Sequence, residues 1–170
     1  SVIDAIEGRV VDAPLSGSQV FIDLNGNLVK DSDEPDSSSD QNGFFAVENL
    51  VGEGSPKIIS VGGTDTKTGE ELPNLALMSD LPSDASKTMS VTPITTVVAA
   101  AETPAAKEKV LEALGVQGTV EELLTTDNWA AAEAGDESAK DLQRKNQQIG
   151  LILQTAETLV ESNSSTKAAD

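Results

Sequence analysis

The residues best suited to chemistry lie in one segment, 23–34, of this 170-residue chain. Counted from the first residue of the segment, side-chain oxygens stand at positions one, three, five, nine and twelve, which are Asp23, Asn25, Asn27, Asp31 and Glu34. Position seven, Val29, can add its backbone carbonyl. This is the ligand spacing of an EF-hand calcium loop, in which a bidentate glutamate closes the shell. The spacing therefore predicts a calcium site.

The segment departs from the EF-hand pattern in two ways. An EF-hand has glycine at position six, where this chain has Leu28, and the available glycine is Gly26 at position four. A strand is expected to enter the loop and a polar stretch, 35–40, to leave it, whereas an EF-hand loop is flanked by helices. We therefore interpret the segment as a calcium loop joined to a β-domain.

Other acidic residues and other interpretations stay open at this loop. Asp33, Asp36 and Asp40 are close enough in sequence to supply an alternative or additional oxygen. Magnesium fits less well, because its small octahedral shell keeps several waters. The alternative interpretation is a solvated acidic turn between two strands.

Composition excludes several functional classes. The chain has 11 Lys and Arg against 29 Asp and Glu, a formal charge of −18, which argues against a nucleic-acid or anionic-membrane surface. It has no histidine and no cysteine, so it lacks the usual zinc ligands, and histidine- or cysteine-based catalysis and disulfides are excluded. No adjacent pair of acidic residues forms a recognisable acid/base constellation, so we expect no enzymatic activity. The sequence also has no apolar run long enough for membrane insertion.

The elements that must hold the loop change character near residue 92. Short strands separated by turn residues are expected at 6–11, 19–24, 44–47, 57–61, 75–78 and 88–91, and such spacing without helices favours an antiparallel sandwich. In the strand that enters the loop, Val20 and Ile22 alternate with Phe21 and Asp23, which predicts one buried face. We expect an α+β fold in which 1–91 forms the β-domain.

The rest of the chain is expected to form a helical cap or bundle over 92–162, followed by a disordered tail at 163–170. Thr92, Thr103 and Thr119 stand where they can cap helices, the first two before prolines and the third in a T-x-x-E box. Gly115 and Gly135 are placed to end helices. In the last helix, from about 138 to 161, an apolar stripe comprises Leu142, Ile149, Ile152, Leu153, Ala156, Leu159 and Val160.

Three segments carry a resemblance to a known family: VVDAPLSGSQVFIDLNGN at 10–27, DEP at 33–35 and DQNGFF at 40–45. Together they resemble a prealbumin-like Cna B-type or carboxypeptidase-regulatory-like domain of bacterial surface proteins, over about residues 5–65. The resemblance implies a seven-stranded sandwich, calcium bound by Asp23, Asn25, Asn27, Asp31 and Glu34, and a turn at 40–43. A looser resemblance, through 62–69, 91–99 and 113–116, is to modules of calcium-dependent adhesins of the repeats-in-toxin type.

Spacing and resemblance together predict a non-enzymatic, calcium-stabilised structural module. The resemblance implies an extracellular or cell-surface location in bacteria, with calcium ions and neighbouring modules of the same large protein as partners. The alternative is an adhesin domain that recognises a peptide or glycan.

Overall fold

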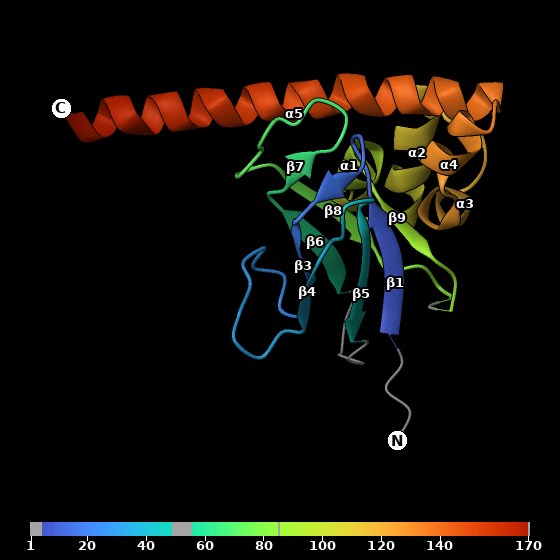
Figure 1. The fold of residues 1–170 in the computed structure, drawn as a ribbon, viewed down its shortest axis with the longest axis horizontal. Helices are drawn as coiled ribbons and strands as arrows, with labels where there is room; N and C mark the ends of the chain where they lie inside the picture. Colours follow the sequence, from blue (N-terminus) through green and yellow to red (C-terminus); the bar gives the residue numbers. More distant parts are fainter. Residues whose placement is uncertain (1–4, 49–55, 85, 170) are drawn as a thin grey trace.

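The computed structural model describes residues 5–48, 56–84 and 86–169, with the backbone alone from 155 onward. The strands are β1 (Ala5–Val10), β2 (Leu15–Ser16), β3 (Gln19–Asp23), β4 (Asp36–Ser38), β5 (Phe44–Glu48), β6 (Lys57–Val61), β7 (Thr64–Asp65), β8 (Ala76–Asp80) and β9 (Met89–Val91). The helices are α1 (Pro93–Ala100), α2 (Pro104–Leu114), α3 (Val120–Thr125), α4 (Asn128–Glu133) and α5 (Glu137–Ala169). The change from strands to helices therefore falls between Val91 and Pro93 (Figure 1).

The described strands form three sheets and, with the helices, give an α+β fold. The sheets have the strand orders β4-β3-β6-β8, β5-β1-β9 and β2-β7. Side chains from the two larger sheets, with Leu15 of β2 and Leu75 just before β8, share one apolar core, whose buried members are Ile6, Val10, Leu15, Val20, Ile22, Phe45, Val47, Ile58, Leu75, Leu77, Met89 and Val91. Burial of this shared core is what holds the two sheets together.

Two details of the strands differ from the sequence prediction. The sheets were expected to be antiparallel, but β9 pairs with β1 in parallel, because the chain crosses from β8 in one sheet to β9 in the other. Strand β3 was expected to bury one face only, yet Phe21 and Asp23 are buried together with Val20 and Ile22. Asp23 is buried because the loop that follows it folds over its carboxylate.

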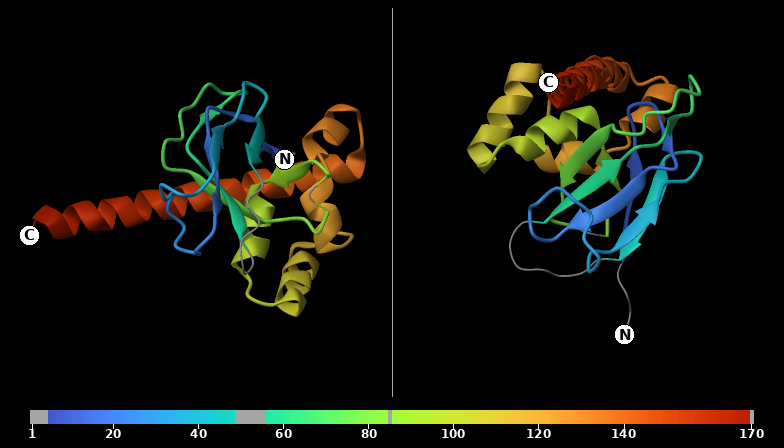
Figure 2. Two further views of the ribbon diagram at one scale, coloured as in Figure 1. Left: turned by 90° about the horizontal axis from the view of Figure 1, so that it is seen from below. Right: turned by 90° about the vertical axis from the view of Figure 1, so that its left-hand side faces the viewer.

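The three expected N-caps begin their helices and Gly115 ends α2, whereas the C-cap of α4 is Ala134, with Gly135 as the residue after it. Thr92, Thr103 and Thr119 each accept a hydrogen bond at the N-terminus of α1, α2 and α3, and Gly115 ends α2 in the left-handed conformation. Helix α5 runs across the rest of the molecule (Figure 2) and is helical through Ala169, beyond the 162 boundary at which we expected a disordered tail to follow.

The buried face of α5 is narrower than the predicted stripe. Leu142 and Ile149 pack against the core formed with α1, α2 and α3, and Leu153 packs against the core of the sheets. Ile152 was expected in the stripe but is 65% exposed, because it lies to one side of the line that Leu142, Ile149 and Leu153 form along the helix. The side chains of Ala156, Leu159 and Val160 lie outside the described residues.

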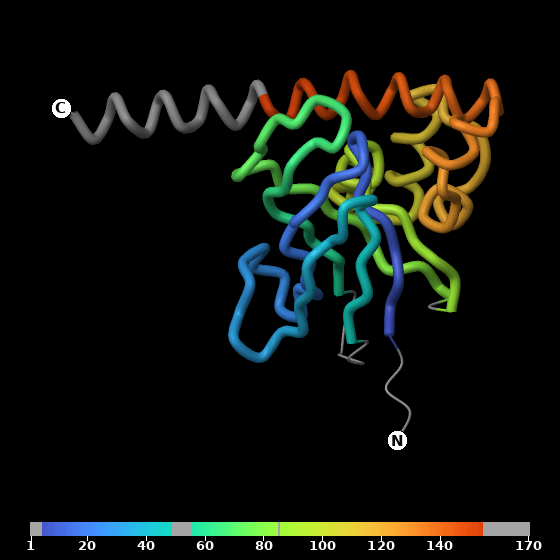
Figure 3. The backbone as a smooth tube through the Cα atoms, viewed as in Figure 1, coloured from blue at the N-terminus to red at the C-terminus, as the bar shows by residue number. Residues whose placement is uncertain are grey.

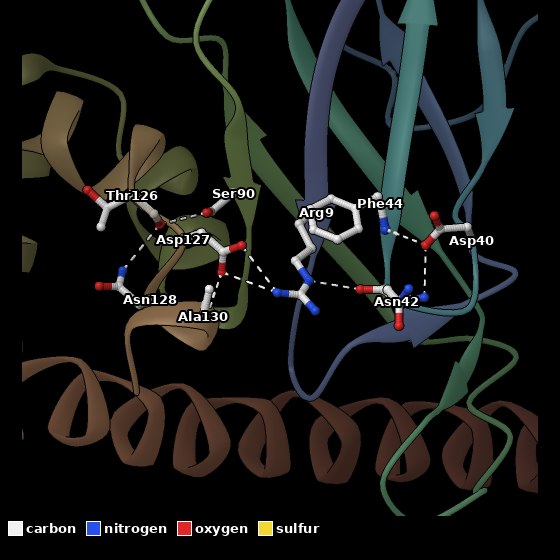
Figure 4. A network of polar contacts seen from close by, with 9 residues as sticks. All are labelled: Arg9, Asp40, Asn42, Phe44, Ser90, Thr126, Asp127, Asn128 and Ala130. Atoms are coloured by element: carbon white, nitrogen blue, oxygen red, sulfur yellow. Dashed lines mark hydrogen bonds and ion pairs between the residues drawn. The ribbon is translucent and has the colours of Figure 1, made fainter. Parts of the chain in front are cut away.

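A polar network joins β1 and the turn before β5 to the helices (Figure 4). The Arg9 guanidinium donates to the Asn42 carbonyl at 2.8 Å and forms an ion pair with Asp127 at 3.2 Å. Asp127 is also the N-cap of α4, and Ser90 of β9 donates to the Thr126 carbonyl just before it. The start of α4 is therefore held directly by two strands.

Candidate metal centre

The twelve-residue segment forms the connection between neighbouring antiparallel strands β3 and β4 (Figure 3). Asp23 is the last residue of β3, and Glu34 lies two residues before β4 begins at Asp36. The amide of Ile22 donates to the Pro35 carbonyl at 3.2 Å and closes the base of the loop. Both ends of the segment are thus anchored in the sheet.

The carboxylates at positions one and twelve are both buried. Asp23 is 2% exposed and accepts hydrogen bonds from the amides of Gly26, at 2.8 Å, and Leu28, at 2.9 Å. Glu34 is 4% exposed and accepts from the amides of Leu24, at 2.8 Å, and Asp31, at 2.9 Å. A carboxylate oxygen that accepts one hydrogen bond keeps a second lone pair. Both residues can therefore hold the loop closed and still offer oxygen to a cation.

The side chains at positions three, five and nine also meet. One oxygen of Asp31 accepts from the amide nitrogens of Asn25, at 2.7 Å, and Asn27, at 2.8 Å. The side-chain carbonyls of Asn25 and Asn27 accept from the backbone two residues on, at 3.0 and 2.9 Å, which makes two successive Asx-turns. The turns place alternate side chains on the inner side of the loop.

Position six has the backbone conformation that an EF-hand glycine supplies. Leu28 has a φ of 63°, and it is the only residue other than glycine with a positive φ among those the structure describes. This conformation aims the Leu28 amide at Asp23, five residues earlier. By residue type leucine departs from the EF-hand pattern here, and residue type alone does not reveal that the backbone turns in the same way.

The donor chemistry fits calcium, although the described side chains do not all direct oxygen atoms toward one point. Three carboxylates, two amide groups and the carbonyl of Val29 are the hard oxygen donors that calcium requires. The amides of Asn25 and Asn27, however, direct nitrogen toward Asp31, so each must turn its oxygen inward to bind an ion. Within the described part of the chain, no three acidic side chains gather closely enough to hold a metal by themselves. The calcium ligand set therefore stays a prediction.

The three further acidic residues have separate surroundings. Asp40 accepts from the amides of Asn42, at 2.8 Å, and Phe44, at 3.0 Å, and so holds the turn before β5. Asp36 lies in β4 and accepts from the Gln19 side chain at 3.4 Å. Asp33 is exposed. Of the three, Asp33 is the residue that lies within the loop itself.

Comparisons with known proteins identify no family for this chain. No family model matches it, and neither a curated protein nor a solved structure is significantly similar. Among the residues described, no helix is both long enough and apolar enough to cross a membrane.

Proposed function

We propose that the chain is a non-enzymatic, calcium-stabilised structural module of a bacterial extracellular or cell-surface protein of the adhesin type. In this proposal the two larger sheets form a prealbumin-like or immunoglobulin-like sandwich, and the helices cap it. Calcium ions and neighbouring modules of the same protein are the partners, and neither nucleic acid nor membrane insertion has a part. The module carries out no reaction of its own.

One observation carries the proposal: the carboxylate at position one accepts the amide of position six, which has the left-handed backbone of an EF-hand glycine. That contact sets the curvature which brings positions three, five and nine together. Asp23, Asn25, Asn27, Val29, Asp31 and Glu34 would then hold calcium. The ion would replace the hydrogen bonds that now link the two amides to Asp31.

Calcium would act on stability through mass action. A ligand that binds the folded state alone stabilises it by RT ln(1 + [L]/Kd). With a Kd of about 10⁻⁴ to 10⁻³ M, as in extracellular modules, about 5 mM calcium adds about 1 to 2 kcal/mol to the free energy of unfolding. The loop would be loaded at extracellular calcium and largely empty at cytosolic levels.

Thermal unfolding with calcium, with magnesium and with chelator tests this proposal. Calcium should raise Tm by about 3 to 8 °C over the chelator, and magnesium should raise it less. In Glu34→Gln the calcium increment should fall to near zero, while the matched exposed variant Glu70→Gln keeps it. Equal Tm values in calcium and chelator, with no heat of binding by calorimetry, would rule out calcium stabilisation.

The alternative function is an adhesin domain that recognises a peptide or glycan. A cleft beside the same loop favours the peptide.

A further inference from the structure

A cleft of about 980 Å³ opens between the β3–β4 loop and the junction of α1 with α2. In the right-hand view of Figure 2 the loop, in blue, and α2, in yellow, both lie at the left of the molecule. Its apolar lining includes Leu28 from the loop, Met78 of β8, Leu81 just after that strand, and the small residues 99–101 at the end of α1. Ligand sites commonly have roughly 300 to 1,000 Å³ and a predominantly apolar lining. The cleft therefore has the size and lining of a site for a short segment of a partner.

One wall of the cleft is cationic. The strand register sets Lys57 of β6 beside Asp80 of β8, and Lys107 reaches the same carboxylate from α2. Each lysine nitrogen lies 2.7 Å from a different oxygen of Asp80. Two cations share one anion, so this wall keeps a positive charge in a chain whose formal charge is −18.

The two lysines are held in place yet remain reachable. Lys57 also donates to the Ala99 carbonyl at 3.0 Å, and Lys107 to the Val98 carbonyl at 3.3 Å, both near the C-terminus of α1. Their side chains are 27% and 16% exposed. Ammonium groups fixed by such bonds lose little freedom when a ligand carboxylate arrives. Glu102 also lines the cleft and is exposed. The formal charges of Lys57, Lys107, Asp80 and Glu102 therefore cancel over the whole cleft, and the excess positive charge lies only where the two lysines share Asp80.

Leu28 adds an exposed apolar contact at the rim. Its side chain is 55% exposed although its backbone is in the left-handed region, which costs a residue with a Cβ about 1 kcal/mol or more. Glycine would adopt that backbone without strain and without exposed apolar surface. A leucine at this position is explained if its side chain packs against a ligand in the cleft.

We propose that the cleft binds a short peptide segment that presents a carboxylate to Lys57 and Lys107 and an apolar side chain to Leu28 and Met78. Charge-assisted hydrogen bonds to the lysines supply orientation, and apolar burial supplies the rest of the affinity. The cationic wall does not belong to the metal centre, so this inference goes beyond the calcium proposal and does not depend on it.

Selection from two displayed libraries of random peptides of about twelve residues tests the proposal. One library has blocked C-termini and the other has free C-termini, so the source of the carboxylate is distinguished. Selection should enrich peptides in which an acidic residue or a free C-terminus lies near a large apolar residue. Absence of enrichment in both libraries, or enrichment of peptides that have no carboxylate, overturns the proposal.

Affinity measurements on the selected peptide then test whether it binds in the cleft. Lys107→Gln should weaken binding about tenfold or more, and Lys140→Gln, a matched change outside the cleft, should leave it unchanged. Leu28→Gly should also weaken binding while the fold is kept. The peptide should shift backbone amide resonances at 78–81 and 99–107. Equal affinity in Lys107→Gln and Lys140→Gln, or shifts elsewhere only, overturns the proposal.

The same titration in calcium and in chelator separates the two proposals. If calcium does not raise Tm but the peptide still binds, the result counts against the metal-centre proposal alone. If calcium raises Tm but no peptide binds, the result counts against the cleft proposal alone.

Discussion

Leu28 shows how residue type and backbone conformation oppose each other at one position. Its φ of 63° suits glycine, and a β-branched side chain fits this region worse than leucine does. We expect Leu28→Val to lower the free energy of unfolding by about 1 kcal/mol and Leu28→Gly to leave it equal or higher. Urea unfolding of both variants in chelator measures the difference.

The neighbouring Val29 is the matched control for Leu28. It is also strongly exposed, at 60%, but its φ is not positive. Val29→Gly should lower the free energy of unfolding by about 0.5 to 1 kcal/mol, because glycine there relieves no backbone strain and only increases the conformational freedom of the unfolded chain. A loss of stability in Leu28→Gly as large as in Val29→Gly would contradict the assignment of strain to Leu28.

The fold changes the pKa of Asp12, in the turn after β1. Burial, the nearby Asp65 carboxylate and a 3.4 Å contact with Gln154 act on it, and the net effect raises its pKa from 3.8 to about 6. The folded state therefore holds this proton more tightly than the unfolded state does. Stability from Asp12 is full below about pH 4 and is lost as the pH rises to about 6.

Asp12→Asn should remove that loss. Allowing for solvent screening of a partly exposed carboxyl, we expect the stability of the native protein relative to the variant to fall by about 1 to 2 kcal/mol between pH 4 and pH 7. Urea unfolding of both proteins across this range gives the difference curve. A flat difference curve would show that Asp12 titrates alike in the folded and unfolded states.

The loop residues were predictable from the sequence because their spacing is local. The oxygen positions from Asp23 to Glu34 follow from counting along one segment, and Asx-turns are properties of neighbouring residues. The environment of Asp12 was not predicted, because it depends on Gln154, which lies 142 residues further along the chain. No local pattern in the sequence brings those two residues together.

At the scale of elements, Gly150 links α5 to the turn after β1. A glycine inside a helix ordinarily costs about 1 kcal/mol relative to alanine. Here a Cβ on Gly150 would lie 2.6 Å from Oδ1 of Asp12, so an alanine would displace that carboxylate. The glycine is therefore the residue that lets α5 approach the sheets at this point.

A double-mutant cycle tests this close approach. Gly150→Ala alone should destabilise the protein by about 1 to 3 kcal/mol through overpacking. In an Asp12→Ala background the same change should stabilise it by about 1 kcal/mol, since only helix propensity remains. Additive effects of the two changes, measured by urea unfolding, would contradict the contact.

Elements with strong local signals were predictable, and the others were not. The threonine caps at 92, 103 and 119 were found because capping is local. The short strands β2 and β7 were missed because two-residue pairings such as Leu15 with Asp65 form only when distant segments meet. The parallel pairing of β1 with β9 was missed for the same reason.

At the scale of the whole molecule, the sheets and helices are joined by polar and apolar contacts together. Arg9 and Asp127 form an ion pair across the junction, and the Arg9 guanidinium lies 4.5 Å from the centre of the Phe44 ring. Trp129 of α4 is buried in a cluster with Val11 and Ala13 from the turn after β1. Contacts of both kinds favour cooperative unfolding of the strands and helices.

Trp129 provides the measurement, because it is the only tryptophan and the chain has no tyrosine. Its fluorescence reports the junction, whereas far-ultraviolet circular dichroism reports the helices and sheets throughout. The two urea transitions should coincide, and in Asp127→Asn both should move together to a stability lower by about 1 kcal/mol, since the variant keeps a capping side chain but loses the ion pair with Arg9. If fluorescence changes at a lower urea concentration than circular dichroism, the helices detach before the sheets unfold. The contacts at Arg9 and Trp129 would then be too weak to make the two parts one cooperative unit.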